Sequence, residues 1–249
     1  MSVGFLRSKL RDSAPSAARA LHIGGVTPLS TTDYPGKLSA VVFCQGCPWR
    51  CDYCHNPHLL ARRGSDEIAW KNIVAFLEGR RGLLDAVIFS GGEPTQQAGI
   101  ADAMREVRNM GFRVGLHTAG IYPRRLKALL PLADWVAMDI KAPFDQYAAT
   151  TGRREGGASA LKSMRLILAS GVDHEFRTTV HPSLLTPESL TALAHALAES
   201  GVRKYVLQEF RARGCASAKL RNDARSYLVD SFCEPLAPLF DTFSVRRAL

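Results

Sequence analysis

The chain has 249 residues, of which 46% are hydrophobic and 22% are charged, and its mean hydropathy is −0.05. These values fit one globular domain with a sizeable core and exclude a disordered chain, a collagen-like repeat and a small disulfide-rich protein. No apolar run reaches the roughly 18 residues of a membrane helix, and the N-terminus lacks the apolar core of a secretory signal. We therefore expect a cytoplasmic protein with no membrane partner and with six reduced cysteines.

Basic residues exceed acidic ones by 32 to 23, which gives a net charge of +9. The excess is scattered in arginine pairs, without a long basic run or an RNA-binding aromatic motif: Arg62–Arg63, Arg80–Arg81, Arg124–Arg125, Arg153–Arg154 and Arg246–Arg247. We interpret these charges as solvated surface, with an acidic docking partner as the alternative, and we expect no nucleic-acid partner.

The chain order of apolar patterns predicts alternating strands and helices. Residues 1–20 are rich in Ser, Ala and Arg, so we expect a flexible N-terminal segment followed by a single domain over residues 21–249. Short apolar runs predict strands over Leu38–Phe43, Ala86–Phe89, Arg113–Leu116, Trp135–Met138, Glu175–Val180 and Tyr205–Phe210. Amphipathic stretches predict helices over Asp66–Glu78, Ile100–Met110, Pro123–Leu130, Leu161–Ser170 and Pro187–Ser200.

Helix-end signals support this reading. Gly111, Gly171 and Gly201 each follow a helical pattern at the position of a left-handed C-cap, and Thr186 precedes Pro187 as an N-cap. Alternating strands and helices are typical of a parallel sheet in an α/β fold. We therefore predict a partial (β/α)6 TIM-like barrel, with a doubly wound open sheet as the alternative. In both folds ligands bind at the carboxyl ends of the strands.

Four cysteines follow the first predicted strand, in the segment Cys44-Gln-Gly-Cys47-Pro-Trp-Arg-Cys51-Asp-Tyr-Cys54. A reducing compartment disfavours disulfides, a redox pair would leave two cysteines unused, and zinc ribbons usually separate their cysteine pairs by about 15–20 residues. An iron–sulfur cluster accepts closely spaced thiolates. Cys44 falls outside the spacing of the other three, and we expect it to be a buried thiol at the strand end.

The Cys47-x3-Cys51-x2-Cys54 spacing, with Tyr53 before the last cysteine, resembles the signature of the radical S-adenosylmethionine (SAM) enzymes. The resemblance implies a partial barrel of the radical SAM type, in which three thiolates hold a [4Fe–4S] cluster and the fourth iron binds SAM. It also implies that His55 packs over the cluster.

Further candidates follow the next strands. Ser90-Gly91-Gly92-Glu93-Pro94 resembles the GGEP motif that binds the SAM amino group, although a plain tight turn is the alternative. Strand alternation places Trp135, Ala137, Asp139 and Lys141 on one face, and turns Val136, Met138 and Ile140 toward the helices. Asp139 and Lys141 either form an internal ion pair or, as the resemblance implies, bind SAM. Weaker candidates for SAM contacts are Thr118 and Arg177, and a role for Gln208 is doubtful.

The segments Thr31-Thr-Asp33-Tyr-Pro-Gly-Lys37 and Cys54-His55-Asn56-Pro57 resemble activases of glycyl radical enzymes. The similarity is greatest to the activating protein of anaerobic ribonucleoside-triphosphate reductase. It implies that a flavodoxin- or ferredoxin-like donor reduces the cluster, and that a 5′-deoxyadenosyl radical then takes hydrogen from a glycine of the partner enzyme. The alternatives are a pyruvate formate-lyase activase, a 7-carboxy-7-deazaguanine synthase-like enzyme acting on a small molecule, and a non-catalytic metal- or nucleic-acid-binding protein.

Overall fold

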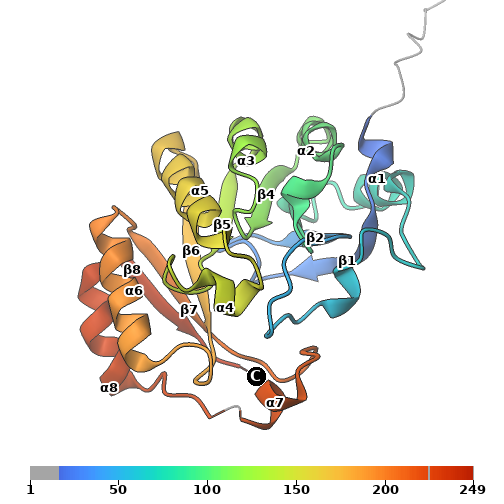
Figure 1. Ribbon diagram of the computed structural model, residues 1–249. Coiled ribbons are helices and arrows are strands. Elements are labelled where there is room, and N and C mark those ends of the chain that lie inside the picture. The colour runs from blue at the N-terminus through green and yellow to red at the C-terminus, as the bar shows by residue number, and fades with distance from the viewer. Residues whose placement is uncertain (1–16, 224, 249) are drawn as a thin grey trace, which may run out of the picture.

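The computed structural model describes residues 17–223 and 225–248 (Figure 1). These residues form one sheet of eight strands, whose spatial order follows the chain from β1 to β8. Six strands match those expected from the sequence: β2 (Ser39–Cys44), β3 (Ala86–Gly91), β4 (Arg113–Thr118), β5 (Trp135–Asp139), β6 (Asp173–Val180) and β7 (Lys204–Glu209). The two edge strands, β1 (Ile23–Ser30) and β8 (Thr242–Arg246), were not predicted.

The sheet topology confirms the partial barrel. Strands β2 to β8 are parallel to their neighbours, and β1 alone pairs antiparallel, with β2. Because the strand order never reverses, the sheet lacks the switch point that defines a doubly wound fold. The carboxyl ends of β2 to β7 therefore share one edge, where the candidate residues were expected.

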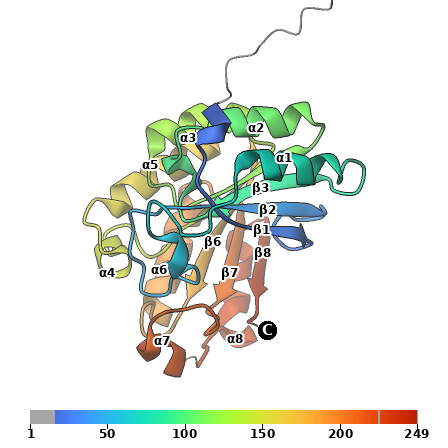
Figure 2. The ribbon, with the colours of Figure 1, turned by 90° about the vertical axis from the view of Figure 1, so that its right-hand side faces the viewer.

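Helices cover the outer side of the curved sheet (Figure 1), and Figure 2 shows α1, α2 and α3 together on one side of the strands. The helices are α1 (Trp70–Glu78), α2 (Ile100–Asn109), α3 (Pro123–Leu129), α4 (Tyr147–Thr151), α5 (Gly156–Ser170), α6 (Pro187–Glu199), α7 (Ala218–Asn222) and α8 (Asp230–Cys233). The predicted ends hold: Gly171 caps α5 with φ of 72°, and the Thr186 side chain accepts a hydrogen bond from the Ser189 amide at the start of α6.

Strand alternation divides the core into two layers, as predicted for β5. Trp135 and Ala137 point into the barrel, where Tyr34 stacks on Trp135 with ring centroids 4.9 Å apart. Val136 and Met138 face the helices in the larger outer core. The apolar inner layer fills the barrel below the carboxyl ends of the strands and leaves the polar end for a site.

The predicted N-terminal segment of residues 1–20 lies mostly outside the described residues. Its last four residues form the 3-10 helix η1 (Ala17–Ala20), in which Ala18 is buried in the outer core. The folded part of the chain therefore includes these four residues. None of the helices in the described ranges has the length and apolar character needed to cross a bilayer.

Candidate functional site

A cavity of about 850 Å³ lies at the carboxyl ends of the parallel strands. It brings together residues from the loop after β2 and from the ends of β3 to β8. Of the twelve residues predicted to bind the cluster or SAM, eleven line this cavity: Cys47, Cys51, Tyr53, Cys54, His55, Gly91, Gly92, Thr118, Asp139, Lys141 and Arg177. Glu93 does not line it. The convergence fits the sequence expectation, while the contacts of these residues with a cofactor stay predictions.

The three cysteines of the predicted ligand set lie in the cysteine loop (residues 45–56) between β2 and the 3-10 helix η2 (Pro57–Leu59). Two arginines donate hydrogen bonds to carbonyl oxygens of this loop: Arg50 to Cys47 at 2.6 Å and Arg153 to Pro48 at 3.1 Å. The Gln45 side chain also bridges to the carbonyl of Ala61 at 2.8 Å. Side chains from within the loop and from outside it therefore fix its path.

All six cysteines are free thiols, and Cys47, Cys51 and Cys54 are half-buried on one cavity wall. Burial, and after it the nearby Glu93 carboxylate, raise the pKa of Cys47 to about 12. Iron binds thiolates, so loading would release protons from these groups. Cys44 is buried in the core at the end of β2 and does not line the cavity.

The donor set fits an iron–sulfur cluster. A single ion would need at least three side chains directed at one position, and no such group of His, Cys, Asp or Glu exists within residues 17–223 and 225–248. A wider inorganic core can be held by several thiolates of one short loop, and all three of these cysteines belong to one loop and line the cavity.

The paired glycines after β3 allow the chain to approach the cysteine loop closely. Gly91 adopts φ of 111°, and a Cβ there would lie 2.5 Å from backbone atoms of Cys44. A Cβ at Gly92 would collide with the carbonyl oxygen of Gly46. Backbone hydrogen bonds join the two segments, from the Gly92 amide to Cys44 and from the Glu93 amide to Gly46. The close neighbours that require glycine here are the end of β2 and the start of the cysteine loop.

The Glu93 carboxylate is fully buried and is already occupied by the protein. Its Oε1 accepts hydrogen bonds from the Thr95 amide at 3.1 Å, the Thr95 hydroxyl at 2.6 Å and the Thr118 hydroxyl at 2.8 Å. Its Oε2 accepts a bond from the Ala119 amide at 2.9 Å. Burial raises the pKa of Glu93, and these hydrogen bonds oppose the rise. The contact of this side chain with the SAM amino group stays a prediction. Within the protein, the carboxylate ties the loop after β3 to the loop after β4.

Lys141 and Asp139 are near neighbours at the end of β5. The Lys141 Nζ lies 3.4 Å from Asp139 Oδ2 and 5.3 Å from the centre of the Tyr53 ring. Burial alone would lower the pKa of Lys141, but Tyr53, Asp139 and Cys51 together raise it well above its ordinary value. The cavity thus holds a charged ammonium beside the cysteine loop. The ion pair that was the alternative reading is present, and it leaves both side chains on the cavity wall.

The segment Phe210–Leu220, after β7, packs against the second half of the cysteine loop. The His55 ring stacks on Phe210 and donates a hydrogen bond to the Arg211 carbonyl at 2.9 Å. Cys215 Sγ lies 3.5 Å from the Asp52 carbonyl oxygen, within a small apolar cluster that includes Tyr53. We name this segment the clasp. It supports the loop through these contacts and was not predicted from the sequence.

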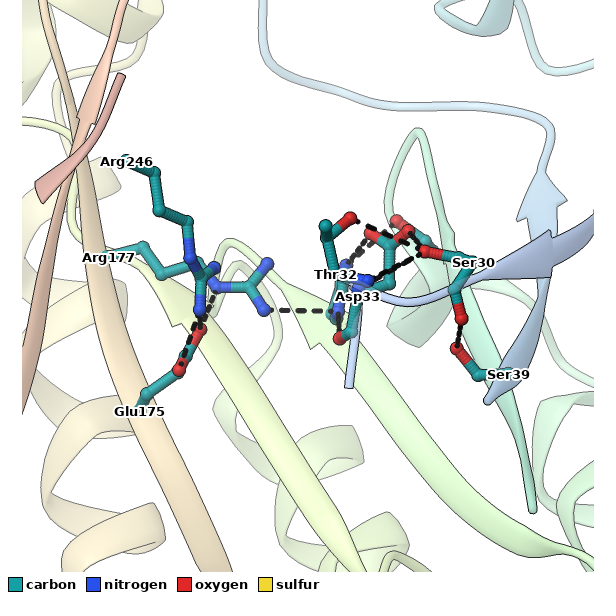
Figure 3. A network of polar contacts seen from close by, with 9 residues as sticks. Ser30, Thr32, Asp33, Ser39, Glu175, Arg177 and Arg246 are labelled. Atoms are coloured by element: carbon teal, nitrogen blue, oxygen red, sulfur yellow. Dashed lines mark hydrogen bonds and ion pairs between the residues drawn. The ribbon is translucent and has the colours of Figure 1, made fainter. Parts of the chain in front are cut away.

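Charged side chains of β6 and β8 meet at the same cavity. Figure 3 shows Arg177 of β6 and Arg246 of β8 converging on Glu175, with distances of 2.5 and 2.9 Å to Glu175 Oε1. His117 of β4 donates to the Asp33 carbonyl at 2.9 Å and lies 3.4 Å from Arg177. Strand alternation places Glu175 on the same face as Arg177, so the sequence could have indicated Glu175 as a site residue. Arg246 was missed because β8 was not predicted.

Comparisons with known proteins agree with this geometry. The profile of the Radical SAM superfamily matches residues 41–199. A protein of Methanocaldococcus jannaschii, whose name describes it as a glycyl-radical enzyme activating enzyme, is 34% identical over 197 residues, which are 76% of this chain and 79% of the relative. A pyruvate formate-lyase-activating enzyme of Clostridium pasteurianum is 30% identical over 183 residues, which are 70% of this chain and 75% of the relative.

A solved structure shares the fold. SuiB of Streptococcus suis bound to S-adenosylmethionine superimposes with a TM-score of 0.60 at 14% identity, over 82% of this chain and 48% of that one. The family profile covers more than half of the chain, and it includes the cysteine loop and the ends of β3 to β6 that line the cavity. The chain therefore belongs to the radical SAM superfamily of enzymes, which implies a [4Fe–4S] cluster and SAM as its cofactors.

Proposed function

We propose that this chain is an activase that generates a glycyl radical on a partner enzyme, with anaerobic ribonucleoside-triphosphate reductase as the first candidate partner. The observation that carries the proposal is the convergence of three free thiols, Lys141 and Asp139 on one cavity. The names of the two relatives support the reaction class. The choice of partner rests on the segment Thr31–Lys37, part of which lines the same cavity.

The residues divide the work between the two cofactors. Cys47, Cys51 and Cys54 would hold the cluster, and the Lys141 ammonium would bind the carboxylate of SAM. With one electron from a flavodoxin- or ferredoxin-like donor, the bound cofactors would supply a 5′-deoxyadenosyl radical by cleavage of the S–C5′ bond of SAM, with methionine as the other product, and this radical would take hydrogen from the Cα of a glycine. Asp139 would hold polar groups of SAM, and the buried inner layer under the cavity excludes water.

The test is anaerobic incubation of the reconstituted, reduced protein with SAM and the candidate partner, followed by electron paramagnetic resonance. A glycine-centred doublet that depends on SAM supports the proposal. Formation of 5′-deoxyadenosine that needs no polypeptide, together with turnover of a small molecule, would instead indicate an enzyme of the 7-carboxy-7-deazaguanine synthase type.

Substitutions separate the roles of the two sets of residues. Cys47→Ala, Cys51→Ala and Cys54→Ala should each abolish SAM cleavage, and full activity in any of them would defeat the ligand assignment. Lys141→Ala should weaken SAM binding while the iron content stays unchanged, because its side chain contributes charge rather than a metal ligand.

A further inference from the structure

The cavity contains a second cationic position, remote from Lys141. Glu175 is the shared acceptor of two guanidinium groups: Arg177 Nε at 2.5 Å, and Arg246 Nη2 at 2.9 and 3.1 Å from its two oxygens. One carboxylate balances only one of the two positive charges. Glu175 and Arg177 are each 6% exposed and cannot gain much from solvent, whereas the side chain of Arg246 is 31% exposed and reaches the cavity.

Three further charged residues that line the cavity, Arg247, Glu209 and Asp33, have partners of their own. Arg247 contacts the Leu228 carbonyl and lies 3.3 Å from Asp230. Burial alone would raise the pKa of Glu209, but hydrogen bonds from Ser226 and Ala248 and the charge of Arg247 lower it. Asp33 lies across the opening from Arg246 (Figure 3), with its carboxylate bonded to Ser30 at 2.5 Å and 4.0 Å from His117. None of these three residues therefore balances the second positive charge at Glu175.

Sheet register separates this position from Lys141. Asp139 pairs with Arg177 in the ladder between β5 and β6, and Arg246 pairs with Gln208 between β8 and β7. Strands β5 and β8 are three strand spacings apart, which is about 14 Å along the sheet. With Lys141 proposed to bind the SAM carboxylate, the Arg246 guanidinium is left for a carboxylate from another molecule.

We infer that Arg246 is a specificity residue that binds a carboxylate of the substrate polypeptide, and this inference rests on the proposed function. The carboxylate belongs either to an acidic side chain or to a chain end. A guanidinium binds a carboxylate through two parallel hydrogen bonds, and its partial burial beside Glu175 orients it for that contact. Glu175 is a positioning residue, since it holds Arg246 from one side and leaves the rest of the guanidinium toward the cavity.

The experiment measures binding of three peptides to the reconstituted, SAM-loaded protein by isothermal titration calorimetry. The probes are acetyl-Ala-Gly-Glu-Gly-Ala-amide, the same peptide with Gln in place of Glu, and the Gln peptide with a free terminal carboxylate. We expect at least one carboxylate peptide to bind the wild type about tenfold more tightly than the neutral one. Which of the two binds identifies the source of the carboxylate.

Variants connect this preference to one side chain. Arg246→Gln should remove the preference and Arg246→Lys should keep part of it, whereas Arg203→Gln, an equal charge change at an exposed residue before β7, should leave it intact. The absence of a preference in the wild type, or its persistence in Arg246→Gln, overturns the inference. So does a loss of SAM affinity in Arg246→Gln as large as in Lys141→Ala, since the carboxylate would then belong to SAM. Failure of the proposed function is recorded separately, as absent SAM cleavage by the wild type.

Discussion

Replacing Glu93 by glutamine tests whether its carboxylate is part of the scaffold or a ligand for SAM. Each carboxylate oxygen accepts a backbone N–H, one from Thr95 at 3.1 Å and one from Ala119 at 2.9 Å. In Glu93→Gln one oxygen becomes an NH₂ group. In either orientation that group meets a backbone N–H, so one buried donor loses its acceptor.

The size of the effect follows from burial. A buried amide without a partner costs about 1–3 kcal/mol, and removing a buried charge offsets part of the cost because burial raises the pKa of Glu93. We expect the free energy of unfolding to fall by about 2 kcal/mol, which lowers Tm by roughly 4–8 °C in a chain of this size.

The assay is thermal unfolding of the reconstituted protein without SAM. Glu78→Gln is the matched control, because its side chain is 50% exposed and pairs only with Arg81 within one turn. An unchanged Tm in Glu93→Gln combined with a large loss of SAM affinity would refute the reasoning, since the carboxylate would then act on the ligand rather than on the two loops.

Three further perturbations have distinct expected results. Gly214→Ala should destabilise the protein more than Gly171→Ala in urea unfolding; both glycines have positive φ, but a Cβ at Gly214 would lie 2.7 Å from the His55 carbonyl oxygen, whereas Gly171 is open. Equal losses would contradict the role of the clasp. Burial and then Arg177 lower the pKa of His117 well below 6.5, so the folded protein keeps it neutral while the unfolded chain binds a proton. The stability that His117 contributes is therefore present above about pH 6.5 and is lost at about 1.4 kcal/mol per pH unit below it. Urea unfolding at pH 7.5 and 5.5 should show this loss in the wild type and not in His117→Asn, and parallel curves would contradict it. Cys44→Ala should retain iron and SAM cleavage, because Cys44 does not line the cavity; loss of iron would make it a ligand.

Short sequence patterns predicted those parts of the fold that depend on residues close together in the chain. Alternation in β5 located Trp135 and Ala137 inside the barrel, and turn chemistry located the ends of α5 and α6. The edge strands escaped detection because their burial is uneven: β1 contains two glycines and a proline, and β8 has five partly exposed residues. Such strands form by pairing with the exposed edge of an existing sheet, and a short stretch of sequence does not reveal that pairing.

In the candidate site, too, neighbouring residues could be predicted and contacts between distant segments could not. The spacing of Cys47, Cys51 and Cys54 after a strand was sufficient to predict that they share one cavity wall. The sequence could not show that Glu93 is held by the protein, since two of its hydrogen-bond donors, Thr118 and Ala119, come from a different loop, 25 and 26 residues away. The pairing of Glu175 with Arg246 spans 71 residues and depends on a strand that was not predicted.

The clasp on the cysteine loop has a consequence for the order of biosynthesis. Its contacts join His55 to a residue 156 positions later, and Asp52 to one 163 positions later. A ribosome exposes the cysteines long before residue 215 has left the exit tunnel, so the nascent loop lacks this support while most of the chain is still being made. If cluster insertion requires the supported loop, iron enters only after translation of that region, and pulse-labelled chains stalled before residue 210 should not acquire it.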